Sequence, residues 1–270
     1  MSQTTRDLRI EAIDRLYVPV MVNDSGPHTF LLDTGALGAS LSSGVARAFG
    51  LEEDGWVTLG SLGIGTCRWT DVGLGSGDNS AVSKLVGRQV DGILGSRFLA
   101  WAGLAVTIDY PNETLSLDET ARNPAPLPPG IPLRIVNCYP LAPVHLNDTG
   151  PYLFLLDTGA SVCVVSPEVA RMLELPVGPT GVARGAASDI ASRASALGRL
   201  SVGDTHTKDL KVTVMDCSGV TENAGVQVDG YLGHDWLKRF VVTIDYPGST
   251  LILCEARRGP LPEASLTSGI

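Results

Sequence analysis

The sequence has no hydrophobic run long enough to cross a membrane and is short of basic residues. Its longest apolar candidate, residues 98–106, is too short for a bilayer and is interrupted by Gly103. The first eleven residues are polar and mixed in charge, so no secretory signal is predicted. The 20 Lys and Arg against 29 Asp and Glu leave a net charge of −9, and an acidic surface repels nucleic acids and anionic membranes. We therefore expect a soluble protein without a nucleic-acid or membrane partner.

Cysteine is also scarce, and its spacing matches no metal or redox motif. The five cysteines form an odd set with no C-x-x-C pair and no histidine cluster beside them, so no metal site is predicted. We expect unpaired thiols in a reducing compartment, with the cytoplasm as the default location, against the alternative of a structural disulfide. The cysteines are Cys67, Cys138, Cys163, Cys217 and Cys254.

The main positive feature of the sequence is one unit that occurs twice. The tetrapeptide DTGA at Asp33–Ala36 recurs 124 residues later at Asp157–Ala160, and Phe-Leu-Leu precedes both copies. Downstream, DGILG at residues 91–95 returns as DGYLG at residues 229–233, and the sequence TIDYP also occurs twice. The repetition predicts two lobes of similar fold.

The repeat and the prolines define the expected boundaries. We assign residues 1–122 to an N-terminal lobe and residues 133–254 to a C-terminal lobe. Residues 123–132 are rich in proline, which lacks the N–H that an inner strand needs, so an extended linker is predicted there. Residues 255–270 carry a similar Gly-Pro-Leu-Pro stretch and are interpreted as a C-terminal tail.

Each copy has the pattern of an all-β unit with a few short helices. Apolar runs flank NDSGP at residues 23–27 and NDTGP at residues 147–151, a pattern typical of β-hairpins. Ser-Pro-Glu at residues 166–168 predicts the start of a short helix that ends near Leu173. Strands are expected over 200–202 and 210–214, and further short helices over 96–101 and 234–240.

Two aspartates that end buried strands can divide acid and base chemistry between them. If Asp33 and Asp157 lie close together, like charges oppose the ionisation of both, so the pair holds one proton and titrates as a unit. The ionised carboxylate can take a proton from water while the protonated one polarises a carbonyl, as hydrolysis without a covalent intermediate requires. We expect no cofactor. The threonine hydroxyls would brace the loops and the glycines would permit a close approach; these supporting residues are Thr34, Gly35, Ala36, Thr158, Gly159 and Ala160.

These motifs resemble those of aspartic proteases of the retropepsin and pepsin clan. Each copy has the D-T-G loop, a hydrophobic-hydrophobic-Gly element and a following helix, and the resemblance extends from Leu8 to Leu253. It implies an all-β, bilobal, pepsin-like architecture of two retropepsin-like β-barrel lobes. Asp33 and Asp157 would meet at the lobe interface, beneath a cleft for an extended peptide. The resemblance also implies that the cleft is supported by Ile93, Leu94, Gly95, Tyr231, Leu232 and Gly233.

The predicted function is that of an aspartic endopeptidase acting on peptide or protein substrates. Because both halves of the site lie in one chain, a monomer is expected. Ala36 and Ala160 follow the retroviral form of the loop, whereas pepsins more often have Ser or Thr there. The missing hydroxyl leaves the ionised pair less stabilised, so we expect a less acidic working pH than that of a pepsin.

The second copy contains 14 residues that the first copy lacks, between Leu175 and Leu197. They fall where the family places its flap, the hairpin that covers bound substrate, and they are small and Gly-containing, as a mobile tip should be. We therefore predict a single flap on the C-terminal lobe, against the alternative of a loose surface loop. The flap residues are Val182, Ala183, Arg184, Gly185, Ala186, Ala187 and Ser188.

Two further residues have simpler interpretations. His234 lies next to the cleft-supporting element but lacks ligand spacing, so it is interpreted as a packing residue. Trp56 is a candidate for the cleft wall on the side without a flap.

The alternative function is a peptide-binding or scaffold module without catalysis. A third possibility is an enzyme inhibited by its own residues 1–16 or 255–270.

Overall fold

The structure is a computed structural model that describes residues 3–119, 130–184 and 189–255. The greater part of the predicted linker and nearly all of the predicted tail lie outside these ranges. So do Gly185, Ala186, Ala187 and Ser188 of the predicted flap. Within the described ranges, no helix combines the length and the apolar character needed to cross a membrane.

The N-terminal half forms a seven-stranded sheet that curls into a barrel-like unit, because β3 pairs with β4 on one side and with β6 on the other. At the turn between β3 and β4, Asn23 and Asp24 both have positive φ, at 47° and 63°, as the tightest hairpins require. The strands across this sheet are β2 (Glu11–Ala12), β3 (Leu16–Val22), β4 (Ser25–Asp33), β8 (Gly92–Gly95), β5 (Ser40–Ser42), β7 (Cys67–Gly77) and β6 (Gly55–Ile64).

The C-terminal half repeats this order and adds one strand. Its turn residues Asn147 and Asp148 have φ of 47° and 64°, and β13 closes the sheet by pairing with β17. The added strand is β16, which pairs only with β17 at the sheet edge. The strands are β12 (Arg134–Val136), β13 (Tyr139–Leu146), β14 (Thr149–Leu156), β19 (Gly230–Leu232), β15 (Val164–Val165), β18 (Thr205–Met215), β17 (Asp189–Val202) and β16 (Thr180–Arg184).

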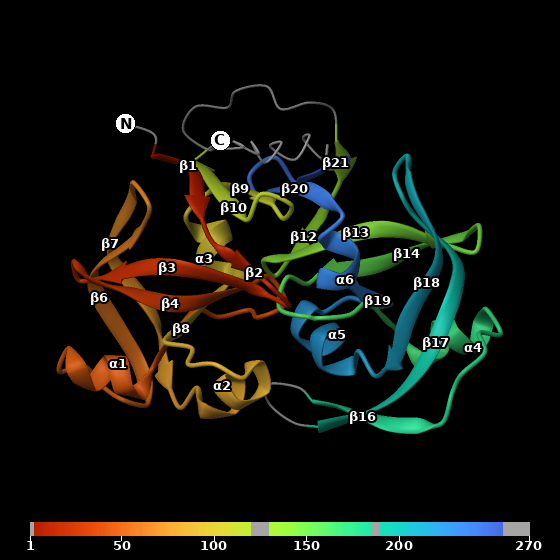
Figure 1. Cartoon of the computed structure of the whole chain (residues 1–270), viewed down its shortest axis with the longest axis horizontal. Helices are drawn as coiled ribbons and strands as arrows, with labels where there is room; N and C mark the ends of the chain where they lie inside the picture. The colour runs from red at the N-terminus through yellow and green to blue at the C-terminus, as the bar shows by residue number, and fades with distance from the viewer. Residues whose placement is uncertain (1–2, 120–129, 185–188, 256–270) are drawn as a thin grey trace, which may run out of the picture.

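A third sheet takes strands from both halves and joins them (Figure 1). Its central pair is β9 with β20, which run antiparallel with Thr107 opposite Thr243. Ile131 and Pro132, which the sequence assigned to the linker, form a short strand at one edge. The strands are β1 (Thr4–Arg9), β10 (Thr114–Glu119), β9 (Leu104–Asp109), β20 (Phe240–Asp245), β21 (Thr250–Glu255) and β11 (Ile131–Pro132).

The six described helices are all short and form three corresponding pairs, with one member of each pair in each half. The predicted helix after Ser166 is present, with the Ser166 hydroxyl accepting a hydrogen bond from the backbone of Val169. The helix predicted over 234–240 is shorter than expected, because Phe240 already begins β20 and is buried there. The helices are α1 (Ser43–Ala48), α2 (Ser80–Val86), α3 (Ser96–Trp101), α4 (Pro167–Met172), α5 (Ser218–Ala224) and α6 (His234–Leu237).

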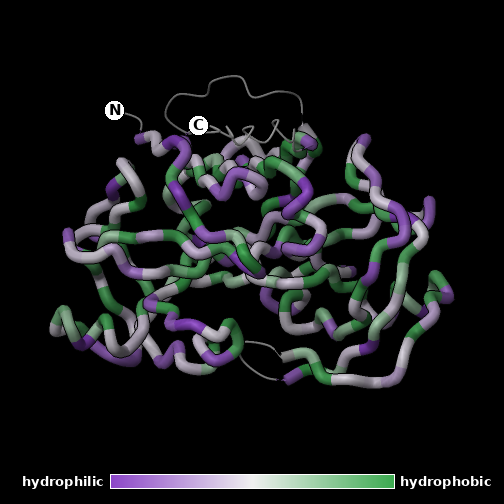
Figure 2. Tube along the Cα trace, viewed as in Figure 1, coloured by the Kyte–Doolittle hydropathy of each residue, from purple (hydrophilic) through white to green (hydrophobic). Residues whose placement is uncertain are grey.

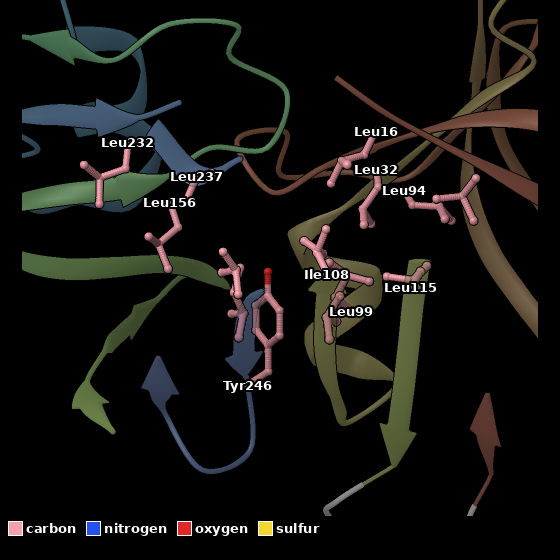
Figure 3. Packing of buried hydrophobic residues seen from close by; sticks show 14 of the residues in the cluster. Leu16, Leu32, Leu94, Leu99, Ile108, Leu115, Leu156, Leu232, Leu237 and Tyr246 are labelled. Atoms are coloured by element: carbon pink, nitrogen blue, oxygen red, sulfur yellow. The ribbon is translucent and has the colours of Figure 1, made fainter. Parts of the chain in front are cut away.

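One hydrophobic core extends through both halves and the shared sheet. Leu32 and Leu94 from one half and Leu156 and Leu232 from the other belong to the same buried cluster, with Tyr246 among them (Figure 3). Along the shared sheet hydrophobic stretches are mixed with hydrophilic ones, while the tip of the β17–β18 hairpin is hydrophilic (Figure 2). Because close-packed interiors resist displacement, this core holds the ends of β4 and β14 in a defined relative position.

Candidate active site

The two DTGA loops have the same internal hydrogen bonds. Asp33 is the last residue of β4, and Asp157 directly follows β14. The Oδ1 atom of Asp33 accepts hydrogen bonds of 2.9 Å from the backbone of Gly35 and of Ala36. Oδ1 of Asp157 accepts the same pair of 2.9 Å bonds from its own loop. Each carboxylate is therefore held in one orientation by its own loop.

The two threonines cross-link the loops. Thr34 donates its backbone N–H to the hydroxyl of Thr158 at 3.0 Å, and Thr158 returns the same bond at 3.1 Å. The Thr34 hydroxyl donates to the carbonyl of Leu156 at 2.5 Å, and the Thr158 hydroxyl donates to the carbonyl of Leu32 at 2.7 Å. Both threonines are fully buried. This reciprocal set connects the ends of β4 and β14 directly.

Each glycine of the loops faces the carboxylate of the opposite loop. A Cβ atom on Gly35 would lie 2.4 Å from Cγ of Asp157, and one on Gly159 would lie 2.3 Å from Cγ of Asp33. No side chain fits at that distance. The structure thus brings together all eight predicted residues of the two loops, with the carboxyls of Asp33 and Asp157 in direct interaction.

The hydrophobic-hydrophobic-Gly elements pass directly beside the loops. β8 runs parallel to β4 with Gly95 opposite Asp33, and a Cβ on Gly95 would lie 2.2 Å from the carbonyl oxygen of Gly38. Gly233 has the same constraint from the Val162 carbonyl, at 2.3 Å. The first residue of each element lines the cleft, and the leucines are buried beneath it; the six residues are Ile93, Leu94, Gly95, Tyr231, Leu232 and Gly233.

Burial raises the pKa of both aspartates, and the charge of Asp33 raises that of Asp157 further. The pKa of Asp157 rises to about 7, first because the carboxyl is desolvated and second because the negative charge of Asp33 is close. Desolvation also raises the pKa of Asp33. Backbone N–H donors and the guanidinium of Arg15 oppose both shifts. A proton shared by the pair is therefore retained to near-neutral pH.

A cleft of about 660 Å³ lies over the pair. Its described wall is mostly apolar, and Arg15, Asp33 and Asp157 are the charged residues among those that line it. From the predicted flap, Val182 and Ala183 line this cleft, together with Ile190 from the paired strand β17. Arg184 belongs to β16. The hairpin occurs only on the C-terminal half of the described chain, since the seven-stranded sheet has no strand that corresponds to β16.

The sequence did not predict that a helix from the N-terminal half would line the cleft. Val82, Leu85 and Val86 of α2 form that wall. Their i, i+3, i+4 spacing and the left-handed Gly87 after them are ordinary helix signals that could have located α2.

Trp56 was expected at the cleft wall, and this expectation is wrong. Its side chain is 67% exposed and lines a separate hollow with Trp101 on the outer face. Trp56 is not among the described residues that line the cleft over the aspartates. His234 is buried, as a packing residue should be, with its ring edge-to-face against Tyr110.

Comparison with known proteins gives one family match. Residues 142–236, about a third of the chain, match the model of a family described as aspartyl protease. No curated protein matches. Among solved structures, a retropepsin-like aspartic protease from Rickettsia conorii is 20% identical and has a TM-score of 0.33, covering 44% of this chain and 94% of its own.

Proposed function

We propose that the protein is an aspartic endopeptidase that hydrolyses peptide bonds with a water molecule activated between Asp33 and Asp157. The observation that carries the proposal is the reciprocal contact of the two loops, in which each carboxylate lies against the glycine of the other. The aspartyl protease family match over residues 142–236 supports it independently. The similar strand order of the two barrel-like sheets also supports the view that the chain is a tandem duplication forming two lobes. The proline-rich residues 123–132, of which the last two form β11, are proposed as the connection between the lobes.

The raised pKa values suit the chemistry. With one proton on the pair, the ionised carboxylate accepts a proton from water and the resulting hydroxide adds to the carbonyl carbon of the scissile peptide. The protonated carboxyl donates its proton to the carbonyl oxygen. The carboxyl that took the proton from water then protonates the amide nitrogen. As the C–N bond breaks, one hydroxyl of the tetrahedral intermediate returns its proton to the pair, so an amine and a carboxylic acid are released and the pair again holds one proton. Substrate would lie extended between α2 and the β16–β17 hairpin.

The direct test is incubation with a peptide mixture derived from a whole proteome, over a range of pH. We expect new peptide termini that disappear when a statine-type transition-state mimic is added, and when Asp157→Asn replaces the wild-type protein. Binding of peptides without any cleavage would instead favour the alternative of a peptide-binding module. Comparing the intact chain with versions trimmed of residues 1–16 or 255–270 tests for self-inhibition.

The shifted pKa values predict how activity depends on pH. Because the pKa of Asp157 is about 7, activity should fall as the pH rises through this value and the pair loses its shared proton. Ala36 and Ala160 offer backbone N–H groups but no hydroxyl to the pair, so the acidic limit should lie above that of a pepsin. A profile of kcat/KM against pH checks both limits. An optimum below about pH 3, under the reference pKa of a free carboxyl, would contradict this prediction.

We further propose that the β16–β17 hairpin is the single flap. Removing residues 183–190 should abolish turnover, because the hairpin supplies one wall of the cleft and would exclude water from bound substrate. The measurement is peptide cleavage by a variant whose circular dichroism spectrum and cooperative unfolding match those of the wild type. A fully active deletion variant would show that the hairpin is only a surface loop.

A further inference from the structure

Arg15 reaches from the N-terminal half to the aspartate loop of the C-terminal half. It lies in the loop between β2 and β3, and its Nε donates a 2.8 Å hydrogen bond to the carbonyl oxygen of Gly159. Its side chain is only 10% exposed and lines the cleft. Burying a guanidinium costs desolvation free energy unless hydrogen bonds and opposite charges offset it.

A chain of contacts defines the position of the guanidinium. Arg15 donates through Nη1 to Oδ2 of Asp14 at 2.6 Å, and Asp14 accepts a bond of 3.3 Å from the hydroxyl of Tyr17. The guanidinium of Arg88 lies 4.2 Å from the centre of the Tyr17 ring and forms two hydrogen bonds with Glu11, at 2.6 and 3.2 Å. The loop that carries Arg15 is thus tied to the end of α2.

At the corresponding positions of the described C-terminal half, the residues are of a different kind. At the repeat spacing, Asp14 corresponds to Cys138 and Arg15 to Tyr139. Tyr139 is buried in an apolar cluster against which Leu37 of the opposite loop packs. The N-terminal hairpin therefore contacts the loop of the other half through a charged side chain, whereas the corresponding position of the C-terminal half carries a buried tyrosine in an apolar cluster. Because the fold accommodates an arginine at this position in one half and a tyrosine in the other, the charge of Arg15 requires an explanation beyond folding.

The peptide group that Arg15 contacts is the one that holds Asp157. The Gly159 carbonyl and the Ala160 N–H belong to the same planar peptide, and that N–H donates to Oδ1 of Asp157 at 2.9 Å. A donor on the carbonyl fixes the plane and strengthens the N–H as a donor, since hydrogen bonds in a chain polarise one another. Arg15 thus acts on the Asp157 carboxyl through one peptide group.

We propose that Arg15 is a positioning residue for the aspartate pair, which orients the Asp157 loop through the Gly159 carbonyl and sets the pH range of activity through its positive charge. The proposal rests on the proposed protease function. It assigns this control to a residue of the N-terminal half that, of the two aspartate loops, is hydrogen-bonded to the Asp157 loop. In agreement with it, the guanidinium lowers the pKa of both aspartates, against the larger effect of desolvation.

Other ionisable groups face the pair. The phenols of Tyr110, Tyr139, Tyr231 and Tyr246 interact electrostatically with one or both aspartates, but burial raises the pKa of each, so they stay neutral throughout the working range. Asp14 neutralises part of the charge of Arg15. Burial lowers the pKa of His234, which keeps it neutral near pH 7.

The test compares Arg15→Gln, which removes the charge and retains a donor, with Arg15→Lys, which retains the charge. Arg9→Gln is the matched control, because Arg9 also donates to a backbone carbonyl, that of Asn112, but on an exposed surface. For Arg15→Gln we expect both limits of the kcat/KM profile to move up by about one pH unit. This is the smallest shift that is typical when a carboxyl loses an adjacent opposite charge. Its kcat should fall about 10-fold or more, since small displacements of catalytic groups are costly.

The lysine variant should keep the wild-type pH limits while kcat falls, and Arg9→Gln should match the wild type throughout. A profile of Arg15→Gln that superimposes on the wild type would overturn the proposal. If the glutamine variant does not fold, Arg15→Lys decides, because displaced pH limits with the charge retained would overturn it as well. If the wild-type protein cleaves no peptide, the proposed function fails. The positioning role is then measured separately, by ¹³C NMR titration of the aspartate carboxyls in wild type and variants.

Discussion

Asp157→Asn is expected to reduce kcat by about 10⁴-fold, the upper end of what positioned acid–base groups contribute. An amide has nearly the shape of a carboxyl, and its oxygen can still accept the hydrogen bonds from the backbone N–H groups of Gly159 and Ala160. It cannot hold or transfer the shared proton, however. Asp33→Asn should have an effect of similar size because the two carboxyls act as one unit.

The same substitution should stabilise the fold at alkaline pH. The raised pKa of Asp157 means that the folded state favours the protonated carboxyl, so the wild type loses stability as the pH rises from the unfolded-state pKa through about 7. Asparagine removes that loss. We expect a higher Tm than that of the wild type at pH 8 and little difference at pH 3, measured by calorimetry.

Asp204→Asn is the matched control for both measurements, because Asp204 lies exposed in the turn between β17 and β18. It should change neither kcat nor the pH dependence of Tm. Retention of wild-type turnover by Asp157→Asn would exclude the proposed chemistry. Equal loss of Tm by Asp157→Asn at both pH values would instead indicate that the residue is only structural.

Gly159→Ala is expected to reduce both activity and stability. Its new methyl group would lie 2.3 Å from Cγ of Asp33, with both oxygens of that carboxylate equally close. One loop must move, so the reciprocal threonine bonds cannot be kept at their present lengths. We expect kcat to fall about 100-fold or more and the free energy of unfolding to fall by about 1–3 kcal/mol, as for other overpacked sites.

Gly44→Ala provides the matched control. Gly44 lies in α1, and a Cβ there would meet no atom within 4 Å. Because alanine is the better helix former, this variant should be more stable by about 0.5–1 kcal/mol, with unchanged kinetics. Denaturant unfolding and steady-state cleavage measure both variants. Wild-type activity in Gly159→Ala would mean that the two loops lie farther apart than the structure places them.

Local sequence signals were sufficient wherever the chemistry of a few neighbouring residues decides the conformation. The Asn-Asp turns are one case, since both residues tolerate positive φ. The helix that starts after Ser166 is another, since the capping hydroxyl and the following proline act within one turn. The length of α6 was overestimated because Phe240 is required as a strand residue by its pairing in the shared sheet.

Such local signals did not predict contacts between segments that are far apart in the sequence. α2 was not anticipated as a cleft wall, because its place there depends on how one half packs on the other. Trp56 was assigned to the cleft wall, but it lines a separate hollow formed within the N-terminal half. The sequence did not indicate a role for Arg15, apart from the difference that the second copy has a tyrosine at the corresponding position. Its partner Gly159 is 144 residues away.

The sequence by itself determined that two equivalent acidic loops exist, that each ends a buried β-strand, and that glycine and threonine accompany each one. These properties follow from neighbouring residues in the sequence and from their repetition. Only the tertiary structure decided that the loops touch, that a hairpin of one half and a helix of the other both line the cleft, and that Arg15 reaches from one half to the loop of the other. The physical reason is that the shared sheet and its continuous core set the distance between the two loops, and no local pattern encodes that distance.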